Sequence, residues 1–456
     1  MSNNSLKAKL SLMNFLEFAV WGAYLVTMGM FLGAHGLGDK IFWFYTVQGL
    51  VSIIMPAIIG IVADRWIPAQ VTLSLCHLLA GAFMIATGVV ATTQIADGGA
   101  LQFGPVFTLY TISVAFFMPT IGLANSVAFN ALEKNGLSTV KDFPPIRVFG
   151  TVGFICAELF VNFVSIGDKA IQFTQDQFYV SGALSLLLAL YALTMPKCAV
   201  NKGASKSLAD ALGLKAFRLF KRKEMAIFFI FSMLLGVSLQ ITNTYGTPFI
   251  EHFSKIPEYA EGFLNGFWAK NPAFLISISQ CAEALCILLI PVCLRKLGIK
   301  GVMLMAMFAW VLRFGFFGIG DTNFPGIVFL ILSCIVYGVA FDFFNVSGGI
   351  YVDSQTAPEQ RSSAQGLFML MTNGIGASLG TFIAGKYIVN NYVVASDPIA
   401  VQSAGWTHSW LIFAAYALVV AVLFMFIFKD PERNKKKASQ TELTQTENAP
   451  EGFVDE

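Results

Sequence analysis

The sequence predicts an all-α polytopic membrane protein, with twelve transmembrane helices arranged in two six-helix bundles. Three observations predict this fold class. The composition is 56% hydrophobic and only 12% charged, whereas a soluble domain has about 25% charged residues. Twelve stretches are long and almost free of charge, and each can supply the roughly 20 residues that an α-helix needs to span the hydrocarbon core. A basic segment divides the stretches into six and six.

The spans are expected to be helices, because a helix satisfies its backbone hydrogen bonds internally, as lipid demands. In chain order they cover residues 10–34, 41–63, 71–95, 104–129, 146–166, 177–195, 225–248, 271–293, 301–319, 325–351, 363–388 and 405–428. Four parts follow: 1–195 as the N-terminal six-helix bundle, 196–224 as a cytoplasmic linker loop, 225–428 as the C-terminal six-helix bundle and 429–456 as a disordered cytoplasmic tail. The tail is too polar to fold alone.

The distribution of lysine and arginine predicts the orientation of the chain. With both termini inside, the inner segments carry 22 of the 29 Lys and Arg residues, the outer loops carry five, and two lie within or at the edge of spans. An excess of basic residues on the cytoplasmic side is the general rule for such proteins. We therefore expect an N-in, C-in topology.

The residues that usually carry enzymatic or metal chemistry form no recognisable pattern. The four histidines make no metal motif, and neither a Ser–His–Asp set nor a phosphate-binding loop is present in the sequence. The seven cysteines fall mostly within spans, at spacings that fit neither a metal site nor a disulfide framework. We expect no enzymatic activity, no cofactor and no metal, and no nucleic-acid partner.

The inner end of the second span carries the motif Gly60-x-x-x-Asp64-Arg65. It resembles the loop signature between the second and third spans of the major facilitator superfamily. Gly60 is expected to allow close helix approach, and Asp64 and Arg65 are expected to form gating contacts that break as two bundles rock. An ordinary basic inner loop is the alternative interpretation.

The fifth span begins with two prolines, Pro144 and Pro145, which suit the start of a helix because their missing N–H groups are not needed there. Four residues then follow at helical spacing and form one stripe: Arg147, Thr151, Phe154 and Glu158. A cation, a hydroxyl, an aromatic ring and an acid predict a stripe that faces a polar interior rather than lipid. The alternatives are that Arg147 reaches the headgroups and that Glu158 pairs structurally.

Three spans of the second half carry further polar and aromatic residues. They are Gln240 and Asn243, Gln280 and Glu283, and Tyr337 and Phe341. Amides that donate and accept hydrogen bonds, together with aromatic faces, suit a neutral, hydroxylated, ring-bearing solute such as a sugar or a nucleoside. Hydrogen bonding between helices is the alternative role for these amides.

Asp342 is the only charged residue between Asp321 and Asp353. A carboxylate in the middle of a span costs roughly 2.5–3.5 kcal/mol on insertion scales. Such residues usually face a cavity and take part in moving a solute or ion, so Asp342 is expected to face a polar interior and to have a role in transport.

Five segments resemble the nucleoside:H+ symporter family of the major facilitator superfamily, and specifically the bacterial nucleoside permeases. They are residues 142–153 (DFPPIRVFGTVG), 225–243 (MAIFFIFSMLLGVSLQITN), 277–283 (SISQCAE), 335–348 (IVYGVAFDFFNVSG) and 364–376 (AQGLFMLMTNGIG). The similarity runs from about residue 8 to 428. It implies a multi-pass transporter of the bacterial cytoplasmic (inner) membrane. It also implies nucleosides as substrate, the lipid bilayer as surroundings, and a monomer with no obligate protein partner.

The resemblance also implies roles for residues. Those expected to bind nucleoside are Arg147, Thr151, Phe154, Gln240, Asn243, Gln280, Glu283, Tyr337 and Phe341, and Asp342 is expected to couple transport to the proton. Glu17 departs from the family pattern, in which Gln is expected, and is either a second protonatable site or part of a local structural pair.

The function predicted from these observations is proton-coupled import of nucleosides by alternating access. Which acid carries the proton stays open among Asp342, Glu283, Glu158 and Glu17. One alternative function is a proton-coupled sugar or oligosaccharide symporter, and another is a membrane receptor that transports nothing.

Overall fold

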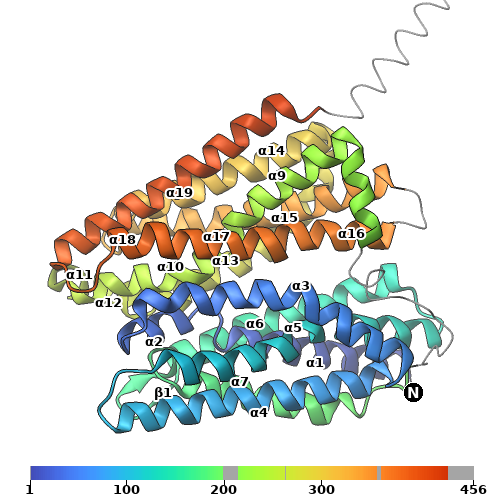
Figure 1. Ribbon diagram of the computed structural model, residues 1–456, viewed down its shortest axis with the longest axis horizontal. Coiled ribbons are helices and arrows are strands. Elements are labelled where there is room, and N and C mark those ends of the chain that lie inside the picture. The colour runs from blue at the N-terminus through green and yellow to red at the C-terminus, as the bar shows by residue number, and fades with distance from the viewer. Residues whose placement is uncertain (1, 199–213, 262, 357–360, 430–456) are drawn as a thin grey trace, which may run out of the picture.

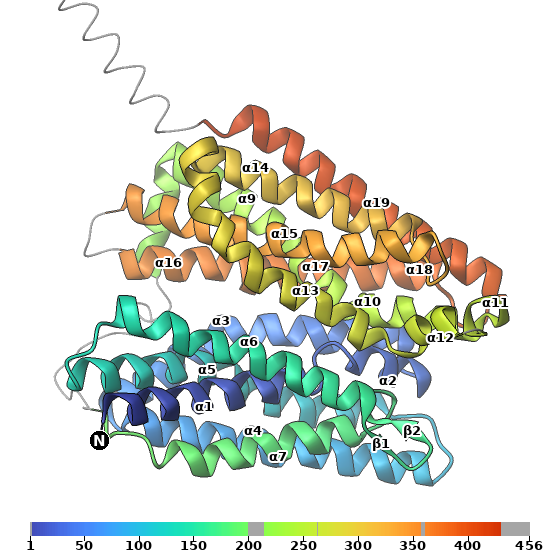
Figure 2. The same ribbon diagram turned by 180° about the vertical axis from the view of Figure 1, so that it is seen from behind.

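The computed structural model describes residues 2–198, 214–261, 263–356 and 361–429. Most of the predicted linker and nearly all of the predicted tail therefore lie outside the described residues. Figure 1 shows two stacked halves, the N-terminal half up to residue 198 below and the C-terminal half from residue 214 above. The reverse view in Figure 2 shows the start of the chain and the end of its last helix at the same end of the molecule.

The N-terminal half is built from seven helices and one short hairpin within the described residues. The helices are α1 (Asn3–Gly22), α2 (Met28–Ala34), α3 (Ile41–Arg65), α4 (Ala69–Ala96), α5 (Phe103–Lys134), α6 (Thr139–Phe163) and α7 (Asp176–Ala192). Strands β1 (Ser165–Ile166) and β2 (Lys169–Ala170) pair antiparallel after α6. Two 3₁₀ turns, η1 (Gly38–Lys40) and η2 (Ile171–Phe173), complete this half.

The C-terminal half consists of helices alone within the described residues. Its first elements are η3 (Leu214–Lys221), α9 (Lys223–Leu239), α10 (Ile241–His252), η4 (Phe253–Lys255), α11 (Pro257–Ala260) and α12 (Phe263–Lys270). They are followed by α13 (Pro272–Cys286), η5 (Ile287–Leu289), α14 (Ile290–Ile319) and α15 (Gly326–Gln355). The last are α16 (Arg361–Met369), η7 (Leu370–Gly376), α17 (Ala377–Ile383), η8 (Ala384–Val389), α18 (Asn390–Tyr392) and α19 (Ile399–Ile427).

Nine helices of the described residues are long and apolar enough to cross a membrane. The prediction of twelve differs from this number for three physical reasons. The first predicted span is broken between Gly22 and Met28, and α7 has only 17 residues. The stretch Pro272–Ile319 holds two predicted spans, which Gly298 separates with a φ of +69°. The number of spans and the membrane orientation of the termini stay predictions.

Helix α6 begins one turn earlier than the two prolines indicate. Ser138 is its N-cap and accepts a hydrogen bond from the Lys141 N–H at 3.4 Å. Asp142 holds this end in place, because its Oδ2 accepts from the Ser138 N–H at 2.9 Å and its Oδ1 pairs with Lys7 at 2.6 Å. The prolines therefore lie in the second turn, within a helix that is anchored before them.

Close packing through glycine occurs at corresponding places in the two halves. In the N-terminal half, a Cβ at Gly22 would overlap the Phe154 carbonyl, and a Cβ at Gly153 would overlap the Phe15 carbonyl, so α1 and α6 pack backbone to backbone. In the C-terminal half, Gly236 of α9 and Gly380 of α17 make the same kind of contact with the facing backbone. These helices correspond to the first and fifth predicted spans of each half, although the halves show no obvious sequence repeat.

Candidate functional site

A cavity of about 240 Å³ lies between the two halves. Its lining comes from α1, α3, α5 and α6 on one side and from α9, α10, α13, α15, η7 and α17 on the other. All nine residues predicted to bind substrate line it: Arg147, Thr151, Phe154, Gln240, Asn243, Gln280, Glu283, Tyr337 and Phe341. The structure therefore brings together residues that are up to 194 positions apart in the sequence (341 minus 147).

The amide side chains of Gln240, Asn243 and Gln280 each use one of their two polar groups, the oxygen or the nitrogen, in a hydrogen bond within the protein. The other polar group of each side chain is available to a bound molecule. Asn243 Nδ2 donates to Gln240 Oε1 at 2.7 Å, which leaves the Gln240 amino group and the Asn243 carbonyl available. With its nitrogen turned toward the backbone, Gln280 donates to the Ile276 carbonyl at 2.7 Å and leaves its oxygen as an acceptor. Gln240 itself lies at the break between α9 and α10. Broken helices are typical of transporter binding sites.

Charge at the cavity centres on Arg147. Its guanidinium lies 3.9 Å from the centre of the Phe18 ring. It interacts electrostatically with three carboxyl groups, those of Glu283, Glu17 and Asp342, in decreasing order. Because Arg147 interacts with all three acids, a proton gained or lost by one acid changes the electrostatic environment of the other two.

Asp342 lies behind the wall of the cavity rather than on it. Its neighbours Tyr337 and Phe341 line the cavity, whereas Asp342 is only 7% exposed and does not. Its Oδ2 has no hydrogen-bond partner in the described part of the chain. Asp342 interacts electrostatically with Glu283 and Arg147. It is therefore placed to respond to the charges of the cavity without contacting a molecule inside it.

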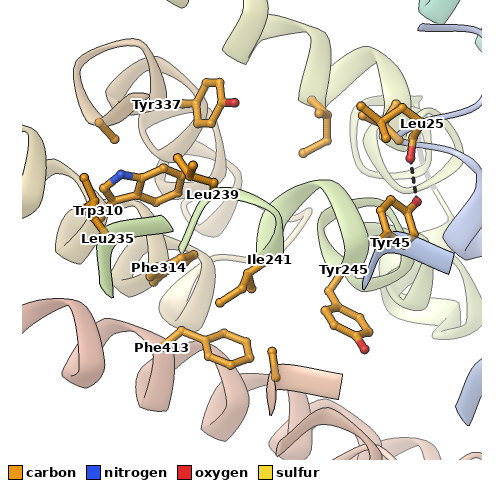
Figure 3. Close-up of a cluster of buried hydrophobic side chains, with 14 of the residues drawn as sticks. Leu25, Tyr45, Leu235, Leu239, Ile241, Tyr245, Trp310, Phe314, Tyr337 and Phe413 are labelled. Atoms are coloured by element: carbon orange, nitrogen blue, oxygen red, sulfur yellow. Dashed lines mark hydrogen bonds between the residues drawn. The ribbon is translucent and has the colours of Figure 1, made fainter. Parts of the chain in front are cut away.

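Aromatic rings form part of both walls. The rings of Tyr337 and Phe341 stack at 5.6 Å with an angle of 18°, and Trp21 meets Phe154 edge to face at 6.4 Å. Figure 3 shows what supports Tyr337, with Trp310 and Phe314 packed behind it toward Phe413. The Trp310 ring contacts the Tyr337 ring edge to face at 5.9 Å. The aromatic wall is thus backed by buried aromatic side chains, among them Trp310 and Phe314.

Several lining residues were missed by the sequence analysis. Gln48 and Ser52 lie on α3, Trp21 on α1 and Asn373 in the π-helical segment η7. Gln48 Nε2 donates to the Tyr110 hydroxyl at 2.6 Å, and neither Gln48 Oε1 nor Trp21 Nε1 has a partner within the described residues. Gln48 and Ser52 are polar residues four positions apart in an apolar span, and this spacing could have predicted that their side of α3 lines a polar cavity.

Arg313 is a buried cation, and it holds the helices behind the cavity. It is 1% exposed, and none of its partners in the described structure is a carboxylate. Its Nη1 donates to the Ser333 carbonyl at 2.8 Å and to Ser279 Oγ at 3.3 Å, and its Nε donates to Thr242 Oγ1 at 3.4 Å. Its guanidinium also lies 4.3 Å from the Tyr337 ring centre. One side chain thus fixes α10, α13 and α15.

We expect Arg313→Met to raise the KM for substrate about tenfold and to lower the melting temperature. The reason is that hydrogen bonds to charged groups contribute about 1.5–3 kcal/mol each and that Tyr337 loses its cation contact. Arg313→Lys keeps the charge but not the planar fork, so its KM should lie in between. Uptake kinetics in vesicles and thermal unfolding of the purified variants measure both effects. An unchanged KM in Arg313→Met would contradict this role.

Glu17 belongs to a closed polar network inside the N-terminal half. Its Oε2 pairs with His77 Nε2 at 2.8 Å, and Thr120 Oγ1 donates to its Oε1 at 2.5 Å. His77 Nδ1 in turn contacts Ser185 Oγ at 3.0 Å, and both Glu17 and His77 are 0% exposed. Of the two alternatives for Glu17, this geometry favours the local structural pair.

The predicted gating motif lies at the end of α3, far from the cavity. Arg65 is the last residue of α3, and the side chain of Asp64 lies outside the described structure. Apart from nearby atoms of its own helix, no described atom lies within 4 Å of the position that a Gly60 Cβ would take. Gly60 therefore makes no close helix contact among the described residues in this conformation, and the gating role of the motif stays a prediction.

Hydrogen bonds between the two halves gather toward the opposite end, where α6 finishes and α13 begins. Asn162 Nδ2 donates to Asn271 Oδ1 at 2.9 Å, and Asn162 Oδ1 accepts from the Phe274 N–H at 3.2 Å. Thr247 also donates to the Val26 carbonyl, and Asn390 donates to the Asp39 carbonyl at 2.8 Å. We call this the closed end of the molecule.

No group of three or more His, Cys, Asp or Glu side chains in the described ranges is arranged to hold a metal ion. The cavity offers amides, aromatic rings, one guanidinium and one carboxyl group instead. This set can bind a polar ring-bearing molecule by stacking and hydrogen bonds.

The sequence of this chain is similar to those of known proteins over nearly its whole length. The family described as "Nucleoside H+ symporter" matches residues 4–433. The xanthosine permease of Escherichia coli K12 is 44% identical and covers 95% of this chain and 99% of its own. The nucleoside permease NupG of the same organism is 42% identical, covering 93% and 96%.

Solved structures agree with the sequence relatives. A crystal structure of the nucleoside transporter NupG has a TM-score of 0.82 at 40% identity and covers 94% of this chain and 100% of its own. A structure of a proton dependent oligopeptide transporter, at 14% identity and a TM-score of 0.67, covers 94% and 100% and shares the fold alone.

Proposed function

The chain belongs to the nucleoside H+ symporter family, and we propose that it binds nucleoside in the cavity between its halves and imports it with a proton by alternating access. It has the fold of the major facilitator superfamily transporters and is a multi-pass membrane protein. The observation that carries the proposal is the shared cavity. Nine polar and aromatic residues from both halves line it, including Arg147, Gln280 and Phe341.

In the proposed binding step, the base of the nucleoside stacks against the aromatic walls. Phe154 lies on one wall, and Tyr337 and Phe341 lie on the other. The free amide groups of Gln240 and Asn243 and the oxygen of Gln280 bond to the ribose hydroxyls or the base edge. Stacking on the aromatic rings and hydrogen bonding to the amides together suit a solute with an apolar ring face and polar groups at its edge.

In the proposed coupling step, Asp342 takes up a proton and loses its charge. A loaded carrier with one buried charge fewer beside the cavity reorients at lower cost, because removing a charge from water is expensive. Glu283 and Arg147 lie within electrostatic reach, so binding at the cavity and protonation at Asp342 influence each other. One proton driven by about 150 mV supplies roughly 3.5 kcal/mol, which supports accumulation by about a few hundredfold.

The proposal includes the location of the protein and its orientation in the membrane. We place the chain in the bacterial cytoplasmic membrane as a monomer of twelve spans with both termini inside, because the basic residues gather on that side. The closed end then faces outward, and the conformation is inward-facing. Asp64 and Arg65 then lie at the inner end of α3, where gating contacts would form in the outward-facing state.

We expect Phe341→Leu to raise the KM for nucleosides about tenfold. Stacking of a base on an aromatic ring contributes about 1–3 kcal/mol, and leucine keeps the apolar volume but not the flat face. Phe341→Tyr is the matched control, since it keeps the ring and should keep the KM within about twofold. Initial rates of labelled uridine uptake by cells provide the measurement. Equal KM values for the leucine and tyrosine variants would contradict stacking at this position.

Competition between solutes tests the proposed substrate class. Labelled adenosine uptake should be inhibited by excess uridine and unaffected by excess lactose. Inhibition by lactose but not by uridine would instead favour the sugar or oligosaccharide symporter. Purified protein that binds nucleoside but moves none into proteoliposomes would favour a receptor.

A further inference from the structure

The carboxyl group of Glu158 is buried between the halves without a partner. Glu158 is 0% exposed, and both of its oxygens lack a hydrogen-bond partner in the described ranges of the chain. It differs in this from Glu17, another fully buried acid of the N-terminal half, whose two oxygens are both engaged. Among the described residues, Glu158 is thus a fully buried acid whose two oxygens both lack the hydrogen bonds that usually compensate burial.

Glu158 lies between the cavity and the closed end. On α6 it stands one turn after Phe154, which lines the cavity, and one turn before Asn162, which bonds to α13. Residues at this spacing share one face of a helix. Glu158 also interacts electrostatically with the thiols of Cys281 on α13 and Cys334 on α15. Its side chain therefore belongs to the interface along which α6 must separate from the C-terminal half when the closed end opens.

The charged and titratable groups around this interface offer no compensation for an ionised Glu158. On the elements packed against α6 they are Lys7, Lys9 and Glu17 of α1, Tyr110, Glu133 and Lys134 of α5, Lys169 of β2, and Cys281, Glu283 and Cys286 of α13. On α6 itself, Arg147 interacts with Glu283, Glu17 and Asp342. None of these groups is an ion-pair or hydrogen-bond partner of Glu158 among the described residues.

Burying an ionised carboxylate without a partner is strongly unfavourable even after relaxation of the protein. The neutral acid costs far less, because only a polar group is desolvated. The closed end therefore accommodates Glu158 as the acid, with the proton on one of its two oxygens. When α6 and α13 separate, water reaches the carboxyl group, and the acid can release this proton to solvent.

We propose that Glu158 is a proton-binding residue that controls closure of this end of the transporter. Closure requires that the carboxylate takes up one proton from the adjacent solution, and opening allows the proton to return to it. This role rests on the proposed alternating-access function and adds to it, since Asp342 couples the proton to the solute whereas Glu158 couples a proton to the conformation. An acidic outer solution then favours the inward-facing state.

The test measures the opening of the closed end directly and needs no transport. Nitroxide labels are placed at Lys169→Cys and Lys255→Cys, exposed positions on either half, in a chain whose native cysteines are replaced. The Asp342→Asn background removes the coupling acid from the pH response. Distances between the labels are recorded in nanodiscs from pH 5 to pH 9 without nucleoside.

With Glu158 present, the long-distance population should grow with pH, by up to about tenfold per pH unit for linkage to one proton. Glu158→Gln should stay closed and change less than about twofold over the range, and Glu158→Leu should behave in the same way if the glutamine variant folds poorly. Glu17→Gln is the matched control and should keep the pH response. The proposal is overturned if Glu158→Gln keeps the full pH response, if it opens at every pH, or if the parent chain does not respond to pH.

The outcome is separable from the proposed function. Failure of nucleoside uptake with an intact pH response would reject the nucleoside symporter and leave Glu158 as a proton-binding residue. Normal uptake with a pH response that does not depend on Glu158 would reject only this inference.

Discussion

Asp342→Asn is expected to abolish concentrative uptake while downhill movement of nucleoside continues. Asparagine has nearly the same size and keeps a polar group in the 7% exposed site, but it cannot bind and release a proton at neutral pH. Accumulation in vesicles with an imposed pH step should fall from about a few hundredfold, the value that roughly 3.5 kcal/mol supports, to about onefold. Labelled uridine inside the vesicles at steady state gives the measurement.

The control for this prediction is Asp353→Asn, which changes an exposed acid on the same helix, α15. It should accumulate uridine as the parent chain does. If Asp342→Asn still concentrates uridine against its gradient, Asp342 is not the coupling group, and Glu283 becomes the first alternative because it lies on the cavity wall beside Arg147.

Arg147→Gln is expected to lower kcat/KM for nucleosides between tenfold and a hundredfold. A hydrogen bond or contact to a charged group contributes about 1.5–3 kcal/mol, and each 1.4 kcal/mol is a factor of about ten. The variant also leaves Glu283 and Asp342 without the cation that they face. Initial uptake rates over a range of uridine concentrations separate the KM from the maximal rate.

Two variants make the Arg147 experiment specific. Arg147→Lys keeps the charge and should recover part of the lost activity, although its ammonium group cannot stack on Phe18 as the guanidinium does at 3.9 Å. Arg295→Gln removes an exposed cation from α14 and should leave uptake unchanged. Full activity of Arg147→Gln would mean that the cation has no part in substrate binding.

The sequence predicted the residues of the cavity better than it predicted their contacts. Helical spacing placed Arg147, Thr151 and Phe154 on one face, and the resemblance to nucleoside symporters added the amides of the other half. All nine line one cavity, while their binding roles stay predictions. The family and the transport function are confirmed by the family match and by relatives at 42–44% identity.

What the sequence could not predict depends on contacts between distant segments. The pairing of Glu17 with His77 joins α1 to α4, and the three helices held by Arg313 meet only in the fold. The position of Asp342 behind the wall rather than in it depends on the rotation of α15. A periodic pattern indicates which residues share a face but not what that face meets.

Helix breaks were missed for a local reason. The predicted spans 10–34 and 225–248 are defined as stretches almost free of charge, yet the chain interrupts the first after Gly22 and the second at Gln240. Neither span gains a charged residue at its break, although residues 241–248 (ITNTYGTP) are more polar than the apolar α9. That drop in apolar residues is the signal that could have located the second break. Both breaks lie beside the cavity, where departures from regular helix expose polar backbone.

The most direct test of the account is proton movement caused by substrate in proteoliposomes. Purified protein is reconstituted in weakly buffered vesicles without a pH gradient, and the outer pH is recorded as uridine is added outside. The account predicts that the outer solution becomes more alkaline as uridine enters, and that Asp342→Asn gives no such change. Uridine entry without any alkalinisation, or alkalinisation that persists in Asp342→Asn, would contradict proton symport through this residue.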